Sequence, residues 1–106
     1  MTEDELLRKE ILFDSIYFNR QTYSAALLSA GAAVETCLAV ATGTVKNAIA
    51  VIRPPGHHAE SDASRGFCHF DNVSIATQVV RERFPEEYRK VMIVDWYVQP
   101  IVFIDP

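Results

Sequence analysis

Apolar residues recur along the middle of this chain with the period of an α-helix. Those that share one face between residues 21 and 42 are Leu27, Ala30, Val34, Leu38 and Ala41. They predict a long amphipathic helix that packs this face against other elements. Gly43 follows directly and is typical of the residue that ends a helix in the left-handed conformation. Charges are sparse here, so we expect the helix to be buried on more than one side.

A shorter helix is predicted near the start of the chain. Residues 3–12 carry a partial apolar stripe, and Thr2 with Glu5 fits the pattern of a capping box. Residues 14–19 follow as a loop that contains two aromatic side chains.

A third helix is predicted over residues 72–84. The apolar side chains on one of its faces are Val73, Ala76, Val80 and Phe84. Asp71 or Asn72 can serve as its N-cap, because a short side-chain oxygen satisfies the free amides of the first turn.

Two continuous apolar runs, residues 48–52 and 91–94, predict strands that are buried on both faces. With the helix between them they make one βαβ unit, whose crossover should be right-handed and whose strands should be parallel. The predicted fold class is therefore α/β, with a parallel βαβ core flanked by helices. The carboxyl ends of parallel strands lie at one edge of the sheet, where α/β proteins usually place their chemistry.

Chemically active side chains follow both predicted strands. Residues 53–58, Arg-Pro-Pro-Gly-His-His, form a stiff turn after the first strand, and Asp95 ends the second. Two imidazoles and a carboxylate should then converge, which suits general acid–base catalysis because an aspartate orients a histidine ring. The alternatives are a rigid turn whose His57 and His58 bond locally, and an Asp95 that merely ends a strand.

Composition narrows the classes of function for this chain of 106 residues. Its net charge is −4, and no basic stripe indicates direct nucleic-acid binding. It has no uninterrupted apolar run of 18 residues, so no membrane span is expected. Cys37 and Cys68 are far apart and form no CxxC pair, so a reducing compartment is expected. With 49% hydrophobic and 23% charged residues, the chain has the composition of one small globular domain.

Two motifs, at this spacing and in this order, resemble the zinc-dependent histone deacetylase family in its class II branch. They are residues 53–59, Arg-Pro-Pro-Gly-His-His-Ala, and residues 66–73, Gly-Phe-Cys-His-Phe-Asp-Asn-Val. The resemblance covers residues 13–96 and implies a partial histone deacetylase domain with an arginase-like α/β fold. Residues 1–12 are then an N-terminal extension, and residues 97–106 are a divergent C-terminal tail.

The resemblance also implies roles for particular residues. The family uses zinc to hydrolyse the acetyl-amide of acetyl-lysine. By this resemblance His57, paired with Asp95, would help to hold water and stabilise charge, and His58 would be the general base and acid. Gly66 and Phe67 would line the narrow tunnel for the lysine stem, because an aromatic face covers methylene groups well.

The resemblance breaks after Trp96. Where the family has Asp-Trp-Asp-Val-His-His-Gly, this chain has Asp-Trp-Tyr-Val-Gln-Pro, so Tyr97 and Gln99 stand in place of two zinc ligands. The family's third ligand and its carbonyl-polarising tyrosine have no counterpart here. We therefore expect no metal ligands and no bound cofactor in this chain. It is expected to be a truncated, catalytically incompetent fragment. Cys68 would lie beneath the site, and its simpler interpretation is a small buried apolar residue.

Two functions remain open. The first is that of an enzyme fragment, whose family acts on acetylated histones or other acetyl-lysine proteins in the nucleus or cytoplasm. The second is a non-catalytic interaction module that competes with a full-length deacetylase for partners such as deacetylase-complex subunits. Open sheet edges and uncovered apolar faces motivate this alternative. A product without stable function is a third possibility.

Marginal stability is expected for this chain by itself. Two strands are too few for an independent sheet, and a short chain buries a small share of its surface. A compensating strand at residues 101–104 would change that expectation.

Overall fold

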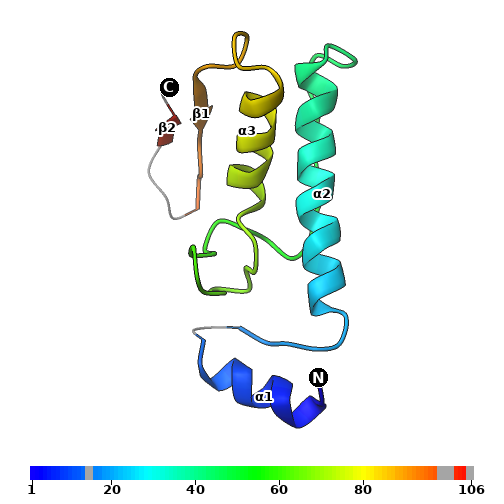
Figure 1. The fold of residues 1–106 in the computed structure, drawn as a ribbon, viewed down its shortest axis with the longest axis vertical. Coiled ribbons are helices and arrows are strands. Elements are labelled where there is room, and N and C mark those ends of the chain that lie inside the picture. Colours follow the sequence, from blue (N-terminus) through cyan, green and yellow to red (C-terminus); the bar gives the residue numbers. More distant parts are fainter. Residues whose placement is uncertain (14–15, 98–101, 105–106) are drawn as a thin grey trace.

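The computed structural model describes residues 1–13, 16–97 and 102–104 (Figure 1). The elements within them are α1 (Glu3–Ile11), α2 (Thr22–Ala41), α3 (Asn72–Arg83), β1 (Val91–Ile93) and β2 (Val102–Ile104). The three helices occur where the sequence predicts them, within one or two residues at each end.

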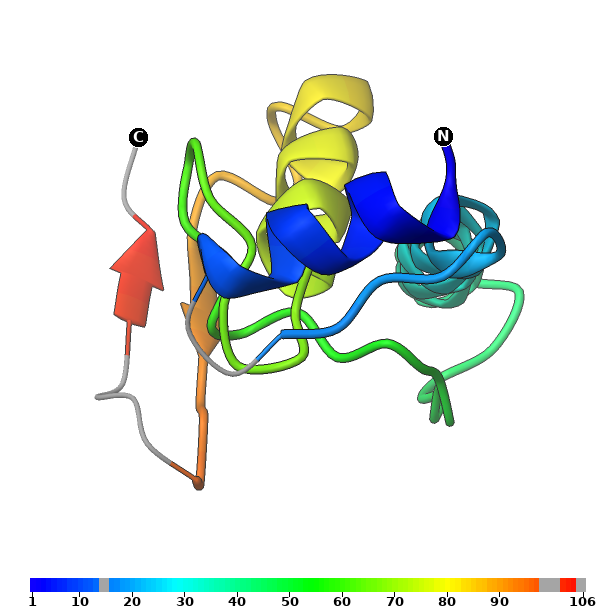
Figure 2. The same cartoon turned by 90° about the horizontal axis from the view of Figure 1, so that it is seen from below.

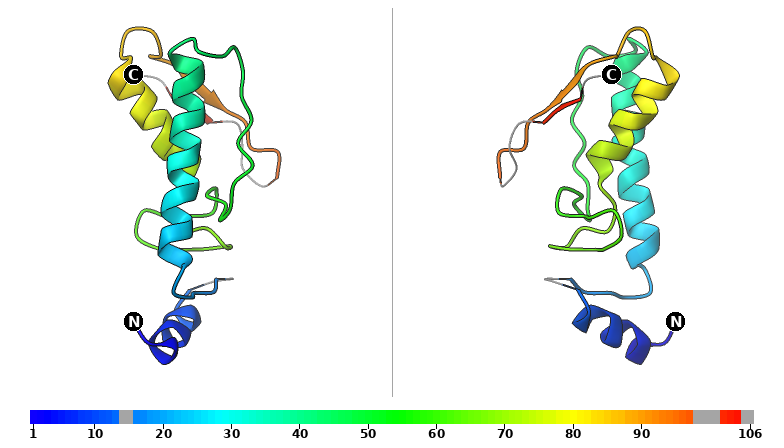
Figure 3. Two further views of the ribbon diagram at one scale, coloured as in Figure 1. Left: turned by 90° about the vertical axis from the view of Figure 1, so that its right-hand side faces the viewer. Right: turned by 60° about the vertical axis from the view of Figure 1, so that its left-hand side comes forward.

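The helices α2 and α3 lie side by side and pack against each other (Figure 1). The strands β1 and β2 lie on the side of α3 away from α2, and α1 lies beyond the N-terminal end of α2 (Figures 1 and 3). The molecule is elongated, with extents of 48 × 26 × 22 Å. The pair of helices therefore forms the support for the loop that joins residue 53 to α3.

The core lies between α2 and α3 and is built largely from small side chains. The buried residues of these two helices are Ala26, Ser29, Ala30, Ala33, Leu38, Asn72, Ala76, Thr77 and Val80. Small side chains let two helix backbones approach closely. Each Å² of apolar surface that this contact removes from water stabilises the folded state by roughly 25 cal/mol.

The buried face of α2 differs from the predicted one. Ala30 and Leu38 are buried as predicted. Leu27, however, is 53% exposed, and its neighbour Leu28 is 77% exposed. On α3, Val73 was assigned to the packed face but is 47% exposed. The physical reason is size: most of the buried residues of α2 are alanine or serine, and the bulkier Leu27 in their place would hold the helices farther apart.

Capping residues begin and end the helices as the sequence predicts. The Thr2 hydroxyl accepts from the amide of Glu5 at 3.2 Å, and the Glu5 carboxylate accepts from the amide of Thr2 at 2.7 Å. Asp71 is the N-cap of α3, since its carboxylate accepts from the amide of Ser74 at 3.1 Å. Gly43 follows the C-cap of α2 with a φ of +78°, which costs glycine little.

The parallel βαβ core was predicted from two strands, and the structure does not show it. Residues 48–52 form no strand: Ile49 is 90% exposed and Val51 is 96% exposed. Figures 2 and 3 show this segment running alongside α2, apart from β1. A strand is defined by hydrogen bonds to a neighbour, and an apolar run alone does not supply one.

The observed sheet is antiparallel and has two strands within the described residues. β1 pairs with β2 in the register Val91↔Ile104, Met92↔Phe103 and Ile93↔Val102. This agrees with the alternative of a compensating strand near the end of the chain, although residue 101 lies outside the described residues. The pairing supplies hydrogen bonds to one edge of β1.

Among the described helices, α2 alone is long and apolar enough to cross a membrane, judged by length and composition only. No membrane span was expected, because the sequence has no uninterrupted apolar run of 18 residues. The core helix of a soluble protein passes the same test, and α2 packs on α3 and binds a loop carbonyl through Ser29. Its contacts are those of a core helix.

We expect the isolated chain to bind a hydrophobic dye and to self-associate as its concentration rises, because large apolar side chains such as Ile49 and Val51 are exposed. The double substitution Ile49→Lys and Val51→Lys should reduce both effects while leaving helical circular dichroism unchanged. The matched control, Asn47→Lys with Ser61→Lys, adds the same charge at exposed positions without removing apolar surface. A wild-type monomer that unfolds cooperatively and binds no dye would contradict this prediction.

Candidate active site

The turn at residues 53–58 is held by a buried polar cluster. The carbonyl of Pro54 accepts from the Ser29 hydroxyl at 2.8 Å and from the Asn72 carboxamide at 3.2 Å. The same carboxamide donates to the Ser29 hydroxyl at 3.1 Å. Gly56 lies directly on the start of α3, because a Cβ there would be 2.5 Å from the amide nitrogen of Asn72. The turn is therefore joined to both core helices.

The structure brings His57 and Asp95 together from positions 38 residues apart in the sequence. The distance from His57 Nδ1 to Asp95 Oδ2 is 2.6 Å, and the two side chains are 29% and 17% exposed. The other oxygen of Asp95 accepts from the amide of Tyr97 at 3.0 Å. A carboxylate at Nδ1 selects the tautomer of the ring and leaves Nε2 for other chemistry.

The ring of His58 lies next to that of His57, with 4.1 Å between the ring centroids. The backbone amide of His58 donates to the Cys68 sulfur at 3.4 Å. Gly66 makes room for the ring, since a Cβ there would lie 2.7 Å from His58 Cδ2. Both histidines, Asp95 and Gly66 therefore lie close together.

Residues 65–68 form a tight turn that the sequence did not reveal. Arg65 and Cys68 exchange backbone hydrogen bonds of 3.0 and 2.8 Å. The two central residues, Gly66 and Phe67, have φ values of +52° and +64°. Turns of this kind favour glycine or asparagine at both positions, so Phe67 is held in a conformation that costs a bulky residue energy. Such strained residues are concentrated at functional sites.

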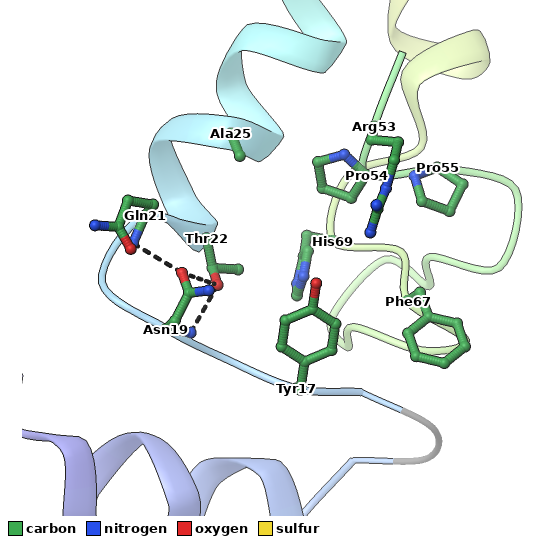
Figure 4. A pocket seen from close by; sticks show the side chains of 10 residues that line it. All are labelled: Tyr17, Asn19, Gln21, Thr22, Ala25, Arg53, Pro54, Pro55, Phe67 and His69. Atoms are coloured by element: carbon green, nitrogen blue, oxygen red, sulfur yellow. Dashed lines mark hydrogen bonds between the residues drawn. The ribbon is translucent and has the colours of Figure 1, made fainter. Parts of the chain in front are cut away.

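A pocket of about 240 Å³ opens between the start of α2 and the loop after residue 53 (Figure 4). Its lining residues are Tyr17, Asn19, Gln21, Thr22, Ala25, Arg53, Pro54, Pro55, Phe67 and His69. Phe67 lines this pocket, and its ring meets that of Tyr17 edge-on at 6.3 Å. His57, His58 and Asp95 do not line this pocket.

The third histidine of the chain, His69, also lines this pocket. His69 Nδ1 lies 3.1 Å from the Ser64 hydroxyl, and its ring centroid lies 5.3 Å from that of Phe18. Burial lowers the pKa of His69, which favours the neutral ring. Two features of the sequence could have indicated this role of His69: its place directly after the Gly-Phe-Cys motif, and the aromatic residues of the 14–19 loop.

The described residues do not fit a zinc site. No group of three histidine, cysteine, aspartate or glutamate side chains within them could hold a metal ion. The ring of Tyr97 occupies the neighbourhood of the histidines, with its centroid 5.8 Å from that of His57 and 6.5 Å from that of His58. Tyrosine is not a usual zinc ligand. Gln99, which was also predicted to stand in place of a zinc ligand, lies outside the described residues.

Comparison with known proteins identifies the family. The histone deacetylase domain matches residues 1–98. Over 96 residues the chain is 49% identical to the histone deacetylase HDA1 of Saccharomyces cerevisiae and to the histone deacetylase clr3 of Schizosaccharomyces pombe, covering 91% of this chain and 14% of each relative. It is 41% identical over 102 residues to the polyamine deacetylase HDAC10 of Homo sapiens, covering 91% of this chain and 15% of that protein.

The chain therefore belongs to the histone deacetylase family, whose domain has an arginase-like α/β fold. It spans about one seventh of the length of the fungal relatives.

We expect iodoacetamide to label Cys37 in the folded chain and to label Cys68 roughly tenfold more slowly or not at all. Burial raises the pKa of both thiols, so a difference between their labelling rates reports accessibility. Cys37 is exposed, and Cys68 is 0% exposed. Mass spectrometry of labelled peptides, with and without denaturant, measures both rates. A Cys37→Ser variant isolates Cys68, and equal labelling of the two thiols in the folded state would show that the loop does not cover the site.

Proposed function

We propose that this chain is part of a class II-like protein lysine deacetylase catalytic domain, and that it contains the acid–base half of the site. The reaction of that domain is hydrolysis of the acetyl-lysine amide. The single observation that carries the proposal is the 2.6 Å contact between His57 and Asp95 in a chain of this family.

The roles of these residues follow from their chemistry. The Asp95 carboxylate accepts from Nδ1 of His57, which fixes the tautomer and stabilises the ring when it takes up a proton. His58 acts as general base toward water and as general acid toward the leaving lysine amine. Gly66 leaves space beside His58, and the exposed ring of Phe67 covers the apolar stem of the substrate lysine.

We propose further that the chain does not turn over substrate as it stands. An amide is a poor electrophile, and a histidine base alone meets ordinary water and an unpolarised carbonyl. Tyr97 stands where the family has a carboxylate ligand, and the described residues do not form a metal-binding set. No step through zinc is therefore assigned to this chain.

We propose the following division of the chain and setting for the intact protein. Residues 13–96 form the deacetylase-like part, residues 1–12 an extension joined to it by contacts such as Glu10 Oε1 with the amide of Phe18 at 2.5 Å, and residues 97–106 a divergent tail. In an intact domain, residues 48–52 would become a strand of a parallel sheet. Its substrates are acetylated histones or other acetyl-lysine proteins, and it resides in the nucleus or cytoplasm.

We expect no release of acetate from an acetyl-lysine peptide when this chain is incubated with zinc. The measurement is a coupled acetate assay, or mass spectrometry of the peptide, at enzyme concentrations that would detect a few turnovers. The matched control is His58→Ala, which removes the proposed general base at a half-buried position. Turnover by the wild-type chain that disappears in His58→Ala would overturn the proposed incompetence while supporting the roles of the histidines.

A second candidate function is that of a non-catalytic interaction module. The specific observation in its favour is the exposed apolar surface, which includes Leu28, Ile49 and Val51 at 77%, 90% and 96% exposure. Surface of this kind marks a site of association when it is contiguous. The occupant would be a full-length deacetylase of the same class or a subunit of its complex.

We expect the chain, as an interaction module, to bind a purified full-length class II-like deacetylase directly. Because apolar contact would carry the affinity, Ile49→Lys with Val51→Lys should weaken binding by roughly tenfold or more, whereas Asn47→Lys with Ser61→Lys should not. Biolayer interferometry with immobilised chain measures both. Failure of the wild-type chain to bind, or equal binding by both variants, would exclude this surface.

A further inference from the structure

The side chain of Asn72, the first residue of α3, makes hydrogen bonds that its position in the helix does not explain. Its sequence position allowed an N-cap role, but Asp71 is the N-cap of α3. The side chain of Asn72 is instead only 4% exposed and joins Ser29 of α2 to the carbonyl of Pro54. Asn72, which belongs to α3, therefore links α2 to the turn that carries the paired histidines.

The hydrogen bonds of this cluster have one consistent assignment. The carbonyl of Pro54 can only accept, so the Asn72 atom 3.2 Å away must be the amide nitrogen. That nitrogen has two hydrogens, and the Ser29 hydroxyl takes the second at 3.1 Å. The Ser29 hydroxyl then donates its own hydrogen to Pro54 at 2.8 Å. Among the described residues, no buried side-chain nitrogen or oxygen is left without a partner.

The short connection between Pro54 and His57 makes this cluster a constraint on the imidazole. Pro54 and Pro55 have fixed φ angles, so little freedom separates the anchored carbonyl from the ring. Gly56 touches the start of α3, where a Cβ would lie 2.5 Å from the Asn72 amide nitrogen and 2.7 Å from the Phe70 carbonyl oxygen. The turn is thus held both by the Asn72 side chain and against the Asn72 backbone.

We propose that Asn72 is a positioning residue for the acid–base site, holding the turn so that His57 Nδ1 meets Asp95. This inference rests on the proposed function, since it concerns the same pair. Asn72 touches neither His57 nor Asp95 through its side-chain hydrogen bonds, and acts through Pro54 and Gly56. Ser29 has a supporting role, because it closes the same cluster.

The test is proton magnetic resonance of the full chain, carrying Ile49→Lys and Val51→Lys to limit association. The readout is the strongly downfield proton shared by His57 Nδ1 and Asp95, and its exchange with water. Asp95→Asn assigns the signal by weakening or shifting it. Asn72→Ala and the near-isosteric Asn72→Asp, which cannot donate when ionised, should remove the signal or speed its exchange by roughly tenfold or more.

A control separates positioning from general loss of stability. Val80→Ala removes packing from the same helix at an 8% exposed site without touching the turn, so its folded fraction should keep the wild-type signal. If Asn72→Ala fails to fold, Ser29→Ala replaces it, with exchange expected to be several-fold faster. Wild-type exchange in the folded Asn72 or Ser29 variants would overturn the positioning role alone. Absence of the signal from the wild-type chain would overturn the pairing itself, and with it both proposals.

Discussion

The close approach of α2 to α3 is the constraint on which the rest of this structure depends. The two helices meet through small side chains, so they can lie near enough for Ser29 and Asn72 to share a hydrogen bond. That bond has little access to water. In such a buried place an intramolecular hydrogen bond is stronger than in water, and a polar group without a partner is costly. One helix contact thus defines where the following loop can be anchored.

The site is a consequence of that anchor. A carbonyl bound between two helices fixes the start of a stiff turn, and the turn brings an imidazole within 2.6 Å of Asp95. On the other side, a sharp turn at residues 65–68 leaves space for the ring of His58 and keeps Cys68 out of water. The paired His57 and Asp95 therefore lie beside the ring of Tyr97, whose centroid is 5.8 Å from that of His57.

The uncovered apolar surface has the same origin as the missing parallel sheet. A helix satisfies its own backbone hydrogen bonds, so α2 and α3 form with only each other as neighbours. A strand needs another strand, and residues 48–52 run extended without one while β1 takes β2 as its neighbour. The apolar side chains of that segment remain in water, as do those on the outer face of α2, which includes Leu27 and Leu28.

The sequence by itself determined the features that depend on local chemistry. Helix periodicity, the capping box at Thr2, the Asp71 cap and the glycine at position 43 all follow from interactions within a few residues. The convergence of His57 and Asp95 was also predictable, because both follow apolar runs and belong to recognisable motifs, although the predicted parallel strands were not needed to bring them together.

Only the tertiary structure decided the rest, because those features depend on distant partners. Which face of α2 is buried depended on the fit to α3, so Leu27 and Leu28 are exposed while Ala26 and Ser29 are buried. Whether residues 48–52 became a strand depended on the presence of a neighbour, and the pairing of β1 depended on residues 102–104. The role of Asn72 depended on a carbonyl 18 residues earlier, and no local pattern records such a contact.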